Sequence, residues 1–170
     1  MKSLWKNEFK PLAIDTPGDI VQFQCASIGT ITNGKIIARI VEYSEPIKSY
    51  TKKSPFFADI DIDDLVVNIQ DNLGEVSGGE FTFEFYITSV ATPNYKYRIM
   101  FIQYGLSLYP VTIVLDETIA KELRLKKQQI ICSDQEEFEN KLTAIINSKK
   151  VGCVISSLLG LTRQDRIANV

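Results

Sequence analysis

The chain has 170 residues, with 19 Lys and Arg, 21 Asp and Glu, and no histidine. The absence of histidine excludes Ser-His-Asp and Cys-His catalysis, histidine-ligated zinc and iron sites, and the usual proton shuttle near neutral pH. The net charge of −2 argues against a broad surface that neutralises phosphates, while 45% apolar and 24% charged residues are typical of a folded soluble protein.

The length of the chain predicts its number of domains, and its cysteines and charges predict its compartment. A chain of this length favours one domain, so we expect a single domain over residues 1–170. Its cysteines, Cys25, Cys132 and Cys153, are odd in number and form no Cys-x-x-Cys pair, as is typical of a reducing compartment. Charges interrupt the first ten residues, and the least charged run, 151–162, is too short for a bilayer. We therefore predict a cytoplasmic protein without membrane contact.

The first predicted element is a helix that begins after Thr16. Thr16 suits the N-cap, Pro17 the first helical position and Asp19 the third. Such a helix, running to about residue 28, would turn three apolar side chains inward: Ile20, Phe23 and Ile28. A strand is the alternative, because apolar residues alternate with glutamines over 21–25. The start signals favour the helix.

The middle of the chain predicts an antiparallel sheet. A tight turn at Asn33-Gly34 precedes a strand at 35–43, and an exposed loop follows at 44–55. Beyond two candidate strands, at 56–62 and 65–69, apolar residues alternate strictly with Thr, Glu and Tyr over 81–88. Short connections then imply a meander of three consecutive strands: 81–90, 95–104 and 109–115.

The C-terminal third predicts helices. Asp116 can cap a short helix over 116–124, and a short strand is expected at 129–132. Ser133 and Glu136 form a capping-box pattern for a helix over 133–149, and a second apolar-faced helix is expected near 151–160. The sequence therefore predicts an α+β domain, in which N-terminal and C-terminal helices pack on an antiparallel meander.

Carboxylates at 59–64 are the strongest candidates for metal chemistry. On a strand, Asp59, Asp61 and Asp63 would share one face, with Asp64 in support, and could hold Mg²⁺ or Ca²⁺. The pattern fails as an EF-hand, since Asp64 and Gln70 occupy positions that need Gly and Glu. A solvated edge strand explains these charges more simply. A divalent-metal-dependent hydrolase is therefore the alternative function.

Nucleophile signatures are incomplete. Ser107 lies in a fragment like a nucleophile elbow, but it lacks the second Gly and a histidine. Cys132 is the best placed of the thiols, because it precedes the predicted helix start at Ser133. A buried cysteine at the end of a strand is the favoured interpretation, because free cysteine is mostly buried. The sequence thus indicates a protein that is not an enzyme.

The faces of the central hairpin depend on the loop at 91–94. With an even loop, for which Pro93 would lie at the turn, the phenylalanines at 81, 83 and 85 lie across from Tyr104, Ile102 and Met100. The opposite face then includes Tyr86, Tyr95, Tyr97 and Phe101. With an odd loop, Tyr97, Ile99 and Phe101 join the phenylalanines, and Lys96 and Arg98 lie beside Tyr86. We expect the even loop.

Tyrosines on the second face suggest the function. Tyr86, Tyr95 and Tyr97 are candidates for partner binding, because Tyr is enriched at protein interfaces. Stacking of nucleic-acid bases is disfavoured, since residues 95–101 lack the glycine of the RNP1 pattern and the chain is acidic. Ordinary cross-strand packing is the simplest alternative. We predict a non-enzymatic protein-interaction module that binds a protein partner or its own copy.

Overall fold

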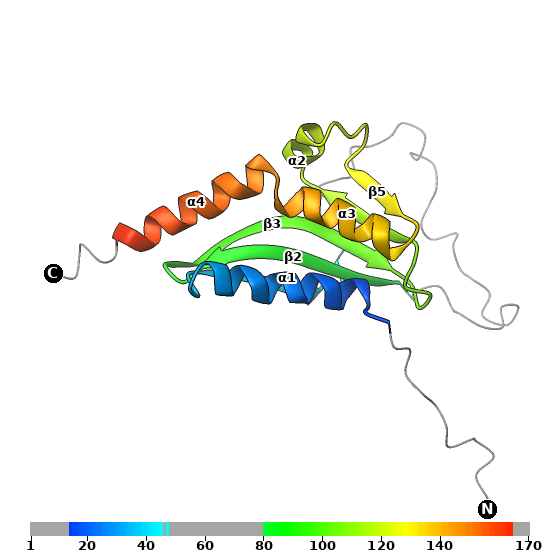
Figure 1. Cartoon of the computed structure of the whole chain (residues 1–170), viewed down its shortest axis with the longest axis horizontal. Helices are drawn as coiled ribbons and strands as arrows, with labels where there is room; N and C mark the ends of the chain where they lie inside the picture. The colour runs from blue at the N-terminus through cyan, green and yellow to red at the C-terminus, as the bar shows by residue number, and fades with distance from the viewer. Residues whose placement is uncertain (1–13, 46, 48–79, 165–170) are drawn as a thin grey trace, which may run out of the picture.

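The computed structural model describes residues 14–45, 47 and 80–164 (Figure 1). Within this part, five strands form one antiparallel sheet in the order β1-β2-β3-β4-β5, joined by four helices. The predicted α+β meander is confirmed. The elements are α1 (Pro17–Ile31), β1 (Ile36–Glu42), β2 (Phe81–Ser89), β3 (Thr92–Tyr104), β4 (Val111–Leu115), α2 (Glu117–Glu122), β5 (Gln129–Cys132), α3 (Gln135–Ile146) and α4 (Lys149–Gln164).

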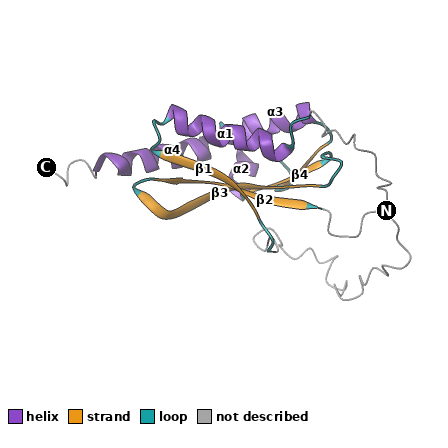
Figure 2. Ribbon diagram, turned by 90° about the horizontal axis from the view of Figure 1, so that it is seen from below, coloured by secondary structure: helices purple, strands orange, loops and turns teal. Residues whose placement is uncertain are grey.

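The helices cover one face of the sheet. Figure 2 shows α1, α3 and α4 on the same side of the strands. The core lies between them and the sheet, and its fully buried side chains include Ile36, Met100, Ile102, Ile113 and Phe138. Burial of these apolar side chains is the main force that holds the layers together.

The helix α1 begins as its sequence predicts. The Thr16 side chain accepts a hydrogen bond from the Asp19 backbone, and Asp19 accepts one from the Thr16 backbone. This capping box satisfies two backbone groups that a helix start otherwise leaves unpaired. The helix interpretation is thereby confirmed over the strand. The prediction for Phe23 is wrong: Val21 and Cys25 face the sheet instead, and Phe23 is 69% exposed.

A bulge in β3 decides the faces of the hairpin. Phe81, Phe83 and Phe85 lie across from Tyr104, Ile102 and Met100, as the even loop predicts. The register then shifts by one residue between Phe85 and Tyr86, so Tyr86 pairs with Arg98 and Ile87 with Tyr97. An extra residue in one strand moves the side chains on one side of it to the opposite face, relative to the partner strand. The odd-loop arrangement therefore holds for residues 97–99, where Tyr97 and Ile99 share the core face.

Two local boundaries differ from the prediction. The turn of the hairpin is Val90-Ala91, and Pro93 lies inside β3 rather than at the turn. The N-cap of α3 is Asp134, one residue after the predicted Ser133, and it accepts a hydrogen bond from Glu137 N.

The last helices divide earlier than predicted. Helix α3 ends at Ile146, and Lys149 and Lys150 begin α4 instead of closing α3. Their backbone N–H groups donate to the Glu122 carboxylate at 2.5 and 3.2 Å. An acidic side chain from α2 therefore caps the start of α4, which a local sequence pattern does not reveal because Glu122 is distant along the chain.

Candidate functional site

An open groove runs between α1 on one side and α3 and α4 on the other. It consists of two adjoining cavities of about 430 and 380 Å³, which share Gln24 and Ile146 in their walls. We call these two cavities together the helix groove. It exists because α1 packs chiefly on β1, whereas α3 and α4 pack further along the sheet. Helices α1 and α3 approach each other at a few positions, and the two cavities are the space that remains between the facing helices.

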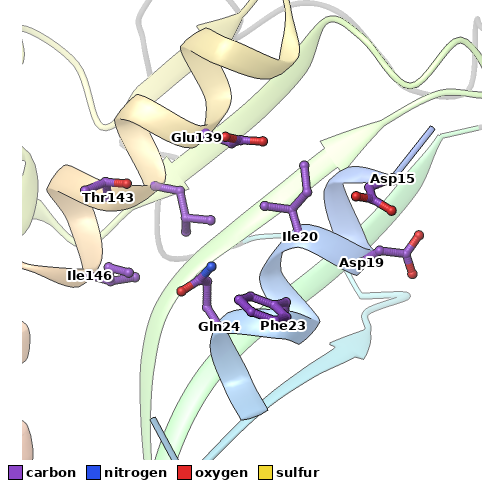
Figure 3. A pocket seen from close by; sticks show the side chains of 9 residues that line it. Asp15, Asp19, Ile20, Phe23, Gln24, Glu139, Thr143 and Ile146 are labelled. Atoms are coloured by element: carbon purple, nitrogen blue, oxygen red, sulfur yellow. The ribbon is translucent and has the colours of Figure 1, made fainter. Parts of the chain in front are cut away.

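One end of the helix groove is acidic. Asp15 and Asp19 lie at the start of α1, and Glu139 faces them from α3 across the first cavity (Figure 3). Hydrogen bonds from the Thr16 side chain and backbone hold the pKa of Asp19 below its usual value, so this carboxylate is charged at neutral pH. Three carboxylates around one cavity of mixed polar and apolar lining favour a cationic group on whatever enters it.

The rest of the helix groove is apolar. Its floor is the sheet, through Phe85, Ile87 and Ile99, each at most 3% exposed. On the α1 side, Ile31 in this second cavity is 76% exposed, and Phe23, which lines the acidic first cavity, is 69% exposed. Large apolar side chains gathered along one groove mark an interaction site more often than scattered ones do. Sequence reasoning missed this site, although α1 has more apolar positions than one face of a helix can turn to a sheet.

The structure separates the three candidate tyrosines. Tyr86 lies on the sheet face opposite the helices, where Lys96 Nζ is 4.2 Å from its ring centroid. Tyr97 lies on the helix face, packs against the core and has Lys150 Nζ 5.8 Å from its ring centroid. Tyr95 is 45% exposed near the hairpin turn. The prediction that Tyr86 and Tyr97 share one face of the sheet is wrong, because the bulge in β3 shifts the register by one residue and turns Tyr97 to the helix face. The role of the three tyrosines in partner binding stays a prediction.

The face opposite the helices holds a buried carboxylate. Glu84 is 2% exposed and accepts hydrogen bonds from Lys96 Nζ and Arg98 Nε. The Arg98 guanidinium also stacks on Phe101, 4.7 Å from the ring centroid, and lies 5.7 Å from the Tyr43 ring. Two cations pair with one carboxylate, so the buried charge of Glu84 is compensated and the cluster carries a net charge of +1. Alternation over 81–88 places Glu84 opposite the phenylalanines but does not reveal that it is buried.

The predicted metal ligands cannot be placed. Asp59, Asp61, Asp63 and Asp64 lie outside the described residues, as do the candidate strands at 56–62 and 65–69. Among the described residues, no group of three or more His, Cys, Asp or Glu side chains is arranged to hold a metal ion. The magnesium or calcium site at 59–64, and the hydrolase that would use it, stay predictions.

The cysteines differ in accessibility. Cys25 and Cys132 are buried, and burial raises the pKa of each thiol to about 11. Their thiolate fraction at neutral pH is therefore very small, which makes them poor nucleophiles. The interpretation of Cys132 as a buried cysteine at the end of a strand is confirmed, whereas Cys153 on α4 is exposed.

We expect the native protein to show one fast thiol. A chromogenic disulfide reagent at mildly alkaline pH should react rapidly with Cys153, and with Cys25 and Cys132 only after unfolding in denaturant. Replacing Cys153 with Ser should abolish the fast phase and leave the slow one. A fast phase that survives this substitution would mean that one of the buried thiols opens to solvent.

Comparisons with known proteins give no relative. No family model, no curated protein and no solved structure matches the chain. Within the described residues, no single helix is long and apolar enough to cross a membrane. Helices α3 and α4 meet the length and composition criteria only jointly, as a pair bent by 49°. The function must therefore be argued from the site itself.

Proposed function

We propose that the chain is a cytoplasmic, non-enzymatic protein-interaction module that binds its partner in the helix groove. The observation that carries this proposal is the exposure of Phe23 and Ile31, at 69% and 76%, in the walls of the first and the second cavity of the helix groove. Solvent contact with such side chains is unfavourable by about 25 cal/mol for each Å² of apolar surface. A partner that covers them recovers that free energy.

The shape and lining of the groove support a helical or extended peptide segment as the bound element. Helix α1 has 15 residues, so it offers a wall of roughly 22 Å at 1.5 Å per residue. Two adjoining cavities along this wall suit anchors that recur at helical spacing on one face of an amphipathic segment. The two buried thiols, Cys25 and Cys132, support a reducing compartment.

Affinity capture from the native host, with matched variants, tests the proposal. Phe23→Glu should remove a partner that wild type retains, because it replaces the exposed aromatic contact with a fourth carboxylate beside Asp15, Asp19 and Glu139. Ile131→Glu is the control, since Ile131 is 60% exposed on β5 and pairs with Thr112, whose neighbours Val111 and Ile113 face the core. Both positions are exposed, so both variants should fold.

The pattern across the variants decides the outcome. A partner lost from Phe23→Glu and kept by Ile131→Glu supports binding in the helix groove. A partner that Tyr86→Ala loses but Phe23→Glu keeps would show that the partner binds the sheet face with Tyr86 and not the helix groove. Capture that no variant changes would contradict both surfaces.

A further inference from the structure

The two cavities of the helix groove differ in charge. Asp15, Asp19 and Glu139 line the first cavity, and Figure 3 shows Glu139 on α3 facing the two aspartates at the start of α1. The described residues that line the second cavity include no charged side chain. Among the described residues, no lysine or arginine lines either cavity. The helix groove is therefore acidic beside the start of α1 and uncharged toward the end of α1.

Within the part of the chain that the structure describes, no cation balances the three carboxylates. Asp19 accepts hydrogen bonds from the Thr16 backbone and side chain, and Glu139 accepts one from Gln135 Nε2 at 2.8 Å. The ion pairs among the described residues all lie outside the helix groove. Like charges around one cavity repel one another, and a cation bound between them relieves that repulsion.

The exposed apolar side chains extend beyond the acidic cavity. Phe23, which is 69% exposed, lines the first cavity, and Ile31, which is 76% exposed, lines the second. Twelve residues of α1 separate Asp19 from Ile31, which is roughly 18 Å at 1.5 Å per residue. An occupant that contacts both ends must therefore be a segment of several helical turns, with a cationic end and an apolar end.

We propose that the helix groove binds a basic amphipathic peptide segment of a partner protein, whose lysine or arginine residues cluster at the end beside Asp15 and Glu139. Its apolar residues contact Phe23 and Ile31, and its cations compensate the carboxylates of the first cavity. This inference rests on the proposed function and specifies the chemistry of the partner. An acidic segment or a wholly apolar segment lacks one of these contacts and should bind more weakly.

Selection from a displayed library of random peptides, each of about 16 residues, tests this chemistry on the immobilised full chain. Phe23→Ser removes the exposed ring without adding charge, and Ile131→Ser is the matched control on β5. Peptides that Phe23→Ser weakens and Ile131→Ser does not are those that bind the helix groove. We expect these peptides to share apolar residues and to carry two or more lysines or arginines at one end.

A charge reversal tests whether those cations meet the acidic cavity. Asp15→Lys combined with Glu139→Lys should weaken a selected peptide about tenfold or more, measured by fluorescence anisotropy. Glu80→Lys combined with Glu117→Lys makes the same change in net charge at exposed positions outside both cavities, and it should change the affinity less than about twofold. Asp19 is left intact, because it caps α1. Circular dichroism confirms that each variant keeps its helices and strands.

The remaining outcomes overturn the inference, and they separate it from the proposed function. Groove-binding peptides without clustered cations reject the basic segment and leave the proposed function standing, as do basic peptides that bind both double variants equally. A library without any peptide that depends on Phe23 rejects both. A wild type that sediments as a dimer, and becomes monomeric with Phe23→Ser, shows that a second copy occupies the helix groove instead.

Discussion

Replacing both Lys96 and Arg98 with Met should lower the free energy of unfolding by about 3–5 kcal/mol at neutral pH. Glu84 is 2% exposed, and these two side chains supply its hydrogen-bonded cations. Without them the carboxylate is a buried, unpaired charge. Urea titration of wild type and variant, followed by circular dichroism, measures the loss.

Three comparison variants separate the buried charge from other effects. Lys96→Met alone should cost only about 1 kcal/mol, because Lys96 is 44% exposed and Arg98 remains. Adding Glu84→Leu to the double variant should recover most of the loss, because it removes the unpaired charge. Arg39→Met should be nearly neutral, since Arg39 is an exposed cation opposite Tyr86. Failure of the Glu84→Leu rescue would show that Lys96 and Arg98 act through packing alone.

The same cluster predicts how stability depends on pH. Burial by itself would raise the pKa of Glu84, but the hydrogen bonds and charges of Lys96 and Arg98 outweigh burial and hold the pKa below its usual value. A folded-state pKa below the unfolded value contributes stability above the unfolded pKa, and that stability is lost as pH falls through the folded pKa. In the double variant the unpaired Glu84 should bind a proton more readily, so its deficit should shrink as the buffer becomes acidic.

The sheet and the start of α1 could be predicted from the sequence, because each is specified by a pattern within a few residues. Alternation over Phe81–Ile87 specifies one buried face, and the capping box at Thr16 specifies where α1 starts. Both signals act within a few residues. They were therefore readable without knowing the rest of the fold, and the meander of β2, β3 and β4 follows from them.

The bulge and the helix groove depend on distant parts of the chain. The sequence favours the even loop over the whole of β3, whereas the structure uses one register on each side of Ile99. This choice places Lys96 and Arg98 on Glu84 while it keeps Ile99 in the core. The helix groove lies between α1 and the helices α3 and α4, so it depends on the distance between the positions at which these helices pack on the sheet. Helical periodicity records which side chains are apolar, not the separation between helices.

Replacing Phe138 with Ala should cost about 3–5 kcal/mol of unfolding free energy. Phe138 is fully buried in the core and is one of three buried side chains that hold α3, with Leu142 and Ile145. Truncation removes apolar burial and leaves a cavity that the surrounding side chains fill only in part. Urea titration should show a lower midpoint with an unchanged slope.

Two further variants make this test specific to the packing of α3. Phe138→Leu should lose much less than Phe138→Ala, because Leu keeps most of the buried apolar volume. Asn140→Ala, on the exposed side of the same helix, should stay within about 0.5 kcal/mol of wild type. Since α3 also carries Glu139 and Ile146, loss of its packing should weaken binding in the helix groove. A Phe138→Ala variant as stable as Asn140→Ala would contradict the docking of α3 on the sheet.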